Sequence, residues 1–418
     1  MSANWVEKSS VKEVIEEVKA KFEKYHTYHA ILMNMDIFVL EISSLLSYSD
    51  SISESDFYFI LSETLFECYQ NHKFNSNSIL EGINDKIIRY FKTPESDYVI
   101  RTSLSINVRE NIRPVYFDDV KISFSKKNDQ AFAENAKEIV DQFKNRYGNI
   151  YPIKYHPIRI YVRHKSPLGA LFKASDTLDF FRGLLNFHLT KYKRIVVNDI
   201  YDLPINRIVT GPVHTIHFAN GKLVEKSNYS YSPDYSGCID SFINVSDLEL
   251  SDAFAKLRKW IPIVLQHRYK DEIIEIFKRY ARALDSRNYD VSFLLLSSLL
   301  EKLTGIKHSY VNDLPVRVSY FYKNSQYHKF TLEKLRKYRD SNVHGGYTSI
   351  MYGEAYAYML KQYVDTLLEF HLFNENKFNN LDEAVELFNT PKDLQKILLK
   401  KKYLDITSKK FLALVTED

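Results

Sequence analysis

Two residues near the end of the chain, Arg339 and His344, are of the types that bind a phosphodiester and move protons around it. They lie in the stretch K-L-R-K-Y-R-D-S-N-V-H-G-G-Y, residues 334–347, which places four basic residues within six positions. A guanidinium pairs with phosphate oxygens through a planar set of donors, and an imidazole exchanges protons near neutral pH. The spacing therefore indicates chemistry on a nucleic-acid backbone.

The residues before His344 predict a helix, and a helix fixes how the polar groups are directed. At about 100° per residue, Asp340 lies one turn before His344 on the same face, so its carboxylate can accept a hydrogen bond from the imidazole and fix the tautomer. Arg339 points about 140° away from His344. One helix aims the pair poorly at a common atom, whereas a second copy of the chain across a two-fold axis would solve the problem.

The same Arg-to-His spacing occurs elsewhere, so the context of each pair must decide. The other pairs are Arg159/His164, Arg182/His188 and Arg207/His214. The first pair lies in a run whose alternating apolar residues indicate a strand. The second lies in an apolar segment that we expect in the hydrophobic core, and the third spans a Gly-Pro pair that would break a helix. Only the pair at 339 and 344 follows a basic helical run.

Four successive segments, 271–285, 288–305, 331–345 and 353–373, have helical periodicity, with the Arg-His pair in the third. Thr331 is expected to cap that third helix. With R-D-S-N-V-H-G-G after L-L-S-S-L-L-E-K-L, these helices resemble a HEPN domain of the Apea-like branch. The resemblance covers the helices from residue 271 onward. It implies a metal-independent ribonuclease that dimerises to build its site, often a toxin or antiviral effector.

In the mechanism that this resemblance and the residue types imply, four residues are catalytic. His344 moves the proton of the RNA 2′-OH or of the leaving 5′-oxygen. Arg339 stabilises charge on the phosphoryl oxygens, and Asp340 orients His344. Asn342 holds either the arginine or the phosphate.

Further residues are expected to bind substrate or support the site. Arg336 and Lys337 would attract the RNA backbone, and Tyr347, just past the glycines, would stack on a base. Glu301 has two interpretations: an exposed carboxylate at a helix end, or a group that holds Arg339 in place. The residues around the motif suggest no metal site, and no cofactor is expected.

Composition places the chain among globular proteins of more than one domain. Its 418 residues suggest two or three domains, and the net charge of +4 favours local basic patches over a wholly basic surface. The two cysteines, Cys68 and Cys238, form no C-x-x-C pair, which indicates neither a disulfide framework nor a zinc site. No segment resembles a signal peptide or a membrane span, so we expect a cytoplasmic protein.

The first half is expected to be α+β, with helices followed by short antiparallel strands at 104–108, 120–124 and 157–163. The last strand puts Arg159, Tyr161 and Arg163 on one face, which is either solvated or a nucleic-acid contact. Asn220-Gly221 predicts a type I′ hairpin. We divide the chain into an α+β regulatory region, 1–245, with a further split near 95 as an alternative, and an all-α HEPN-like domain with additional helices, 246–418.

The function expected from these features is a metal-independent endoribonuclease, acting as an antiphage (abortive infection) or toxin effector. Its partners would be the RNA substrate, a second copy of the chain, and a trigger such as a phage protein sensed by the first half. The alternative is a non-catalytic HEPN-like module that dimerises or binds nucleotides while the first half recognises a partner. The ordered Arg-Asp-x-x-x-His set favours the enzyme.

Overall fold

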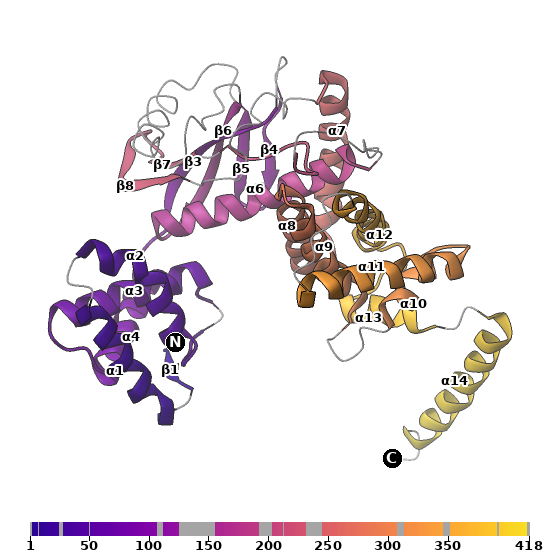
Figure 1. Cartoon of the computed structure of the whole chain (residues 1–418), viewed down its shortest axis with the longest axis horizontal. Coiled ribbons are helices and arrows are strands. Elements are labelled where there is room, and N and C mark those ends of the chain that lie inside the picture. The colour runs from indigo at the N-terminus through magenta and orange to yellow at the C-terminus, as the bar shows by residue number, and fades with distance from the viewer. Residues whose placement is uncertain are drawn as a thin grey trace.

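The computed structural model describes residues 2–6, 8–24, 28–49, 51–106, 112–124, 155–191, 203–211, 213–230, 245–306, 313–345, 352–390 and 393–415. It is a mixed α/β structure with an antiparallel sheet in the first half and helices in the second, as the sequence predicts (Figure 1). Assignment of the second half to a HEPN bundle stays a prediction. None of the described helices is both long and apolar enough to cross a bilayer.

An N-terminal helical unit, at the lower left of Figure 1, has a hydrophobic core of its own. Its elements are β1 (Asn4–Trp5), α1 (Lys8–Lys24), α2 (Tyr28–Ser43), β2 (Leu46–Ser47), α3 (Glu54–Gln70) and α4 (Ser76–Lys92). Phe22, Phe38 and Leu61 are buried in this core. The buried apolar side chains before residue 95 thus form a cluster of their own, and the division of the chain near that residue stays a prediction.

The described strands of the main sheet pair antiparallel in the order β4-β5-β6-β3-β7-β8. They are β3 (Ser96–Leu104), β4 (Val115–Phe117), β5 (Val120–Phe124), β6 (His156–His164), β7 (Val213–Phe218) and β8 (Leu223–Ser230). The strand predicted at 104–108 is wrong for residues 105 and 106, because Leu104 is the last residue of β3, and residues 107 and 108 lie outside the described part of the chain. This strand pairs with β6 on one side and β7 on the other, and strands buried on both faces lose the alternating pattern.

The predicted hairpin at Asn220-Gly221 joins β7 and β8, but its turn is not of type I′. Only Gly221 of the two central residues has positive φ, +85°, whereas type I′ requires two. The Gly221 N–H donates to the Phe218 carbonyl oxygen at 2.8 Å, which closes a turn that ends in a left-handed glycine. With this turn, the register of β7 and β8 places His217 opposite Leu223.

Helix α6 (Pro167–Leu189) covers one face of the sheet and connects it to the C-terminal helices (Figure 1). It begins earlier than the predicted 175–190, because Ser166 caps it and Pro167 occupies its first turn. Its glycine at position 183 lies against α8, where an added Cβ would stand 2.3 Å from the Phe277 carbonyl oxygen. The two helices can approach this closely only because residue 183 has no side chain.

The second half consists of helices, most of which agree with the predicted segments. They are α7 (Asp247–Leu265), α8 (Lys270–Asp285), α9 (Tyr289–Thr304), α10 (Leu314–Val318), η2 (Ser319–Phe321), α11 (Ser325–Gly345), α12 (Gly353–Phe373), α13 (Leu381–Glu386), η3 (Leu387–Asn389) and α14 (Leu394–Val415). Asn288 caps the start of α9 and Gly305, at φ +61°, ends it. Helix α14 stands apart from the other helices in Figure 1.

The hydrophobic core is continuous across residues 245–246, where the sequence places the main domain boundary. Sheet residues such as Ile160, α6 residues such as Leu184 and α9 residues such as Leu300 belong to one cluster. Residues 246–249 form the capping box of α7, in which Ser246 and Glu249 satisfy each other's backbone N–H groups. The polar run at the predicted boundary is thus a helix start within one packed core.

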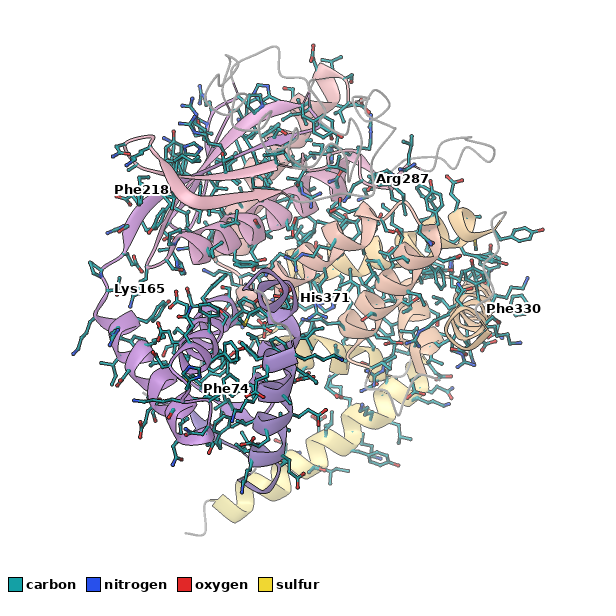
Figure 2. The ribbon with its side chains drawn as sticks, turned by 60° about the vertical axis from the view of Figure 1, so that its left-hand side comes forward. Phe74, Lys165, Phe218, Arg287, Phe330 and His371 are labelled. Atoms are coloured by element: carbon teal, nitrogen blue, oxygen red, sulfur yellow. The ribbon has the colours of Figure 1, made fainter. Side chains whose placement is uncertain are left out.

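A polar cluster joins the N-terminal helical unit to the sheet. Asp56 of α3 is buried, and its carboxylate accepts hydrogen bonds from Ser166 Oγ and Tyr90 Oη, both at 2.9 Å. His164 Nε2 lies 3.4 Å from the same carboxylate. Lys165 is labelled at this junction in Figure 2, and its ammonium lies over the Tyr90 ring, 4.7 Å from the ring centroid.

Candidate functional site

Helix α11 carries the predicted motif and is unbroken from Ser325 to Gly345. The prediction that Thr331 caps this helix is wrong. Asn324 lies at its start, with its side-chain oxygen accepting from the Tyr327 N–H at 3.3 Å, and the Thr331 hydroxyl donates to the Tyr327 carbonyl oxygen at 3.0 Å inside the helix. The helix packs through Leu332, Leu335 and Tyr338, a stripe with a spacing of three residues.

Arg339 contacts Glu301 on α9. Its Nη1 lies 2.8 Å from Glu301 Oε1, and the two side chains are 25% and 12% exposed. The second interpretation of Glu301, a group that contacts Arg339, therefore agrees with the structure, and the exposed carboxylate does not. Within the part of the chain that the structure describes, Glu301 Oε1 receives no well-directed hydrogen bond, so its contact with Arg339 is an ion pair without hydrogen-bond geometry.

A small cavity lies between the two helices at this ion pair. Its volume is about 20 Å³, and Ser297, Glu301, Arg336 and Arg339 supply its polar lining. Such a volume holds about one water molecule. Arg336 therefore faces the same space as the arginine of the motif, as expected for two residues three apart on one helix.

A second contact holds the end of α11. The Tyr338 hydroxyl donates to Asp290 in the first turn of α9. Burial, followed by the hydrogen bond to Asp290, raises the pKa of Tyr338 to about 12, against a smaller opposing effect of Asn342. Gly353, the first residue of α12, approaches both groups, since a Cβ there would lie 3.1 Å from Asp290 Oδ1 and 3.4 Å from Tyr338 Oη. The starts of α9 and α12 thus meet the end of α11.

The other predicted catalytic residues are placed less completely. Asp340 is exposed on α11. Asn342 is half-buried, and its amide, although near enough to Tyr338 to affect the pKa of that phenol, makes no well-directed hydrogen bond among the described residues. His344 lies in the last turn of α11, and its side chain is outside the described part, as is Tyr347. Contact between Asp340 and His344 stays a prediction.

The solvent side of α11 is basic and aromatic. Lys334 and Lys337 are exposed one after the other along it, and the Lys334 ammonium lies 5.3 Å from the centroid of the Phe330 ring. Phe330, at the outer edge of the helix in Figure 2, is 58% exposed, and Tyr327 is 59% exposed. Lys337 is therefore exposed on the same side of α11 as two exposed rings, and its contact with a substrate stays a prediction.

Sequence reasoning missed two residues of this site, Asp290 and Tyr338. The signal for Tyr338 was its place in the buried stripe with Leu332 and Leu335. Asp290 follows the Asn288 cap, a position where an acidic residue ordinarily complements the helix dipole. Its contact with α11 could be known only from the packing of the two helices.

Within the described residues, no group of three or more histidine, cysteine, aspartate or glutamate side chains is arranged to hold a metal ion. The geometry leaves a partly exposed arginine, anchored at one side, five residues before a histidine at a helix end. Comparison with protein-family models, with curated proteins and with solved structures found no match to this chain.

Proposed function

We propose that the C-terminal helices form a metal-independent endoribonuclease site in which the substrate's own 2′-OH is the nucleophile. The observation that carries the proposal is the pairing of Arg339 with Glu301 on α9, which holds one side of the guanidinium while α11 continues to His344. Among the described residues, Arg339 has one carboxylate contact. A guanidinium held at one side can still present its other planar donors to a phosphate.

In the proposed reaction a base removes the 2′-OH proton, and the 2′-oxygen forms a bond to phosphorus. The bond from phosphorus to the 5′-oxygen breaks, and an acid protonates that oxygen. The products are a 2′,3′-cyclic phosphate and a 5′-OH. His344 performs one proton transfer and the histidine of a second copy the other. Arg339 stabilises the charge on the non-bridging oxygens.

The remaining motif residues act around this step. Asp340 fixes the tautomer of His344 from one turn earlier. Asn342, whose shielded amide has unused donors and acceptors among the described residues, holds the phosphate or the arginine. Arg336 and Lys337 attract the RNA backbone, and Tyr347 stacks on a base.

A homodimer is part of the proposal, because one α11 directs Arg339 and His344 about 140° apart. Exposed apolar side chains support a protein interface near the motif. Val291 and Leu295 on α9 are 42% and 44% exposed. Light scattering at micromolar concentration should give twice the chain mass. A monomer that cleaves RNA would reject the shared site.

We propose that residues 1–245 restrain the nuclease and sense a trigger, for which a phage component is the expectation from the resemblance. Because the core is continuous across 245–246, truncation there would expose apolar surface of α8. The restraint is better tested in the full chain by Ser166→Ala, which removes the 2.9 Å hydrogen bond to Asp56 at the junction. Growth arrest on expression should increase. An unchanged or weaker arrest would count against restraint through this junction.

The cleavage experiment uses a labelled RNA in excess EDTA, with matched substrates that are all DNA or that carry one 2′-deoxy group at the scissile position. RNA should be cut to a cyclic phosphate, and both control substrates should survive. His344→Gln should lose about 10²–10⁴-fold in rate, the range for removal of a general acid or base. Cleavage of DNA, or activity that requires Mg²⁺, would reject this mechanism.

His328→Gln is the matched control, because the residue lies on the same helix and its Nδ1 contacts the Tyr363 hydroxyl at 3.0 Å, away from the motif. It should keep the parent rate. Absence of RNA cleavage by a properly folded dimer would favour the alternative, a non-catalytic module that dimerises or binds nucleotides.

A further inference from the structure

The sheet has a second surface that the proposed cleavage site does not use. One face packs on α6, as the contact of Phe117 with Phe180 shows, with ring centroids 4.6 Å apart. Ile122 and Ile160 point to that side and are buried. Residues that alternate with them along β4, β5 and β6 lie on the opposite face, and there the edge of the sheet carries polar and aromatic side chains.

Three of these residues form a row across neighbouring strands. Tyr116 of β4 pairs with Lys121 of β5, and Lys121 pairs with Tyr161 of β6. The Lys121 ammonium lies 5.9 Å from the Tyr116 ring centroid and 5.1 Å from the Tyr161 ring centroid. Tyr116 is 59% exposed at the sheet edge. The row therefore presents to solvent two aromatic rings with a cation between them.

A second cation continues the surface along β6. Arg163 follows Tyr161 by two residues, so it lies on the same face about 7 Å away. It pairs with Asp97 at 3.3 Å, and both side chains are more than 60% exposed, 61% and 66%. An ion pair this exposed is worth little, so the arginine can exchange its carboxylate for a phosphate. Toward β7 the same face is closed, since Thr215 and His217 are buried.

We propose that this surface, the tyrosine-lysine face (Tyr116, Lys121, Tyr161 and Arg163), binds an unpaired nucleic-acid strand. Bases stack on the two rings, Lys121 moves from between them to a phosphate, and Arg163 pairs with the next phosphate. Stacking tolerates any base, because every base has a π-face. A duplex keeps its bases paired and cannot place them on the rings.

The chemistry of the face favours this occupant over an acidic protein segment. Carboxylates would pair with Lys121 and Arg163 but leave the ring faces unused, whereas a nucleotide supplies a flat base and an anion together. RNA and DNA strands share these groups, and we assign the face to RNA because the proposed function gives the chain an RNA substrate, so this one choice rests on the proposed function. The inference goes beyond the proposed cleavage and is tested without it.

Binding is measured on the full chain carrying His344→Ala, in EDTA, by fluorescence anisotropy of a labelled strand of about 12 nucleotides. Tyr116→Ala and Tyr161→Ala should each weaken binding about 5- to 100-fold, while Tyr116→Phe and Tyr161→Phe keep the ring and the affinity. Log affinity falls as log salt rises, and Lys121→Gln and Arg163→Gln should each make this fall less steep, by about one unit of slope. Parent affinity in all the alanine and glutamine variants would overturn the proposal.

Lys12→Gln removes an exposed charge from α1 and is the control for charge loss, with no expected change. Labelled RNA, DNA and duplex RNA of one sequence identify the ligand. Tighter binding of the RNA strand supports the assignment, and equal or tighter DNA binding rejects RNA as the specific ligand. Duplex bound as well as the single strand would overturn stacking. Because cleavage is absent from the assay, a protein that binds here and never cuts RNA would refute only the proposed nuclease.

Discussion

Arg182 and Arg339 both precede a histidine at nearly the same spacing, yet the structure places them in opposite circumstances. Arg182 on α6 is 3% exposed, and Asp179 and Asp285 lie 2.6 and 2.8 Å from its terminal nitrogens. Arg339 is 25% exposed and contacts one carboxylate, that of Glu301. The pKa of the Arg182 guanidinium is raised well above its ordinary value, because its two carboxylates outweigh the burial that would lower it.

The difference teaches what separates a structural arginine from a candidate catalytic one. Arg182 joins α6 to the end of α8, and its terminal nitrogens are occupied by acceptors from its own helix and from Asp285. These two nitrogens are therefore already paired with carboxylates that a substrate phosphate would have to displace. An arginine that must bind phosphate needs one anchored side and one available side, and residue type with spacing alone does not distinguish the two.

The largest expected effect is on stability, at Arg182. Arg182→Ala removes the charge that neutralises Asp179 and Asp285 in a buried setting, so the free energy of unfolding should fall by about 3–5 kcal/mol. Arg339→Ala breaks a partly exposed ion pair and should cost less than about 1 kcal/mol. Urea unfolding followed by circular dichroism measures both. Equal losses would remove the distinction between the two arginines.

The next effect is on rate, at Arg339. Arg339→Lys keeps the charge but not the planar fork, so RNA cleavage should fall about 10²–10³-fold. Arg279→Lys is the matched control, since Arg279 on α8 is also partly exposed and pairs with one carboxylate, Glu275, at 2.8 Å. A similar loss in both variants would mean that the effect is structural and not specific to the motif.

The helices of the second half could be predicted well where local signals mark their ends. The bounds of α12 match the predicted 353–373, and α9 lies between Asn288 and Gly305, a capping asparagine and a left-handed glycine. The start of α11 was missed by six residues, because Tyr327 and Phe330 are exposed large side chains that do not follow the buried stripe. Apolar periodicity fails where rings face solvent.

The contacts that build the candidate site needed the packing of separate helices. Nothing in the spacing of Glu301, Asp290 and the motif residues fixes which turn of α9 meets which turn of α11. The continuity of the core across residue 245 was hidden for a similar reason. The polar Ser246 caps α7. Only the burial of the residues around it shows that this cap lies within one packed core and not at a boundary between domains.

Acid should weaken the region around Arg182 through the buried His214. His214 lines a cavity of about 260 Å³ together with Asp179, Arg182 and Asp285. Burial lowers the pKa of His214 to about 4, while the charge of Asp179 raises this pKa and the charge of Arg182 lowers it further. An unfolded histidine titrates near 6.5. The neutral form is therefore favoured in the fold, and its stabilisation is complete above pH 6.5 and lost as the pH falls toward 4.

The expected size is about 2 kcal/mol between pH 7.5 and pH 5. Urea unfolding at several pH values, for the parent and for His214→Gln, isolates the contribution. The variant should lose part of the slope of stability against pH, whatever its absolute stability. A slope identical to that of the parent would mean that His214 is protonated as readily in the fold as in the unfolded chain.

The smallest effect, and the sharpest test of how Arg339 is held, comes from Glu301→Gln. The substitution keeps the shape of the side chain and removes the charge that faces the guanidinium across 2.8 Å. Stability should change by less than about 1 kcal/mol, because the pair is partly exposed. The cleavage rate should fall about 3- to 10-fold, since the arginine loses its anchor. Glu275→Gln, at the matching pair on α8, should leave the rate unchanged.

If Glu301 acts through Arg339, its substitution should have no further effect on rate in an Arg339→Lys chain. Additive losses in the double variant would show instead that Glu301 affects the rate independently of Arg339. Anchoring of Arg339 by one carboxylate would then not be what distinguishes it from Arg182.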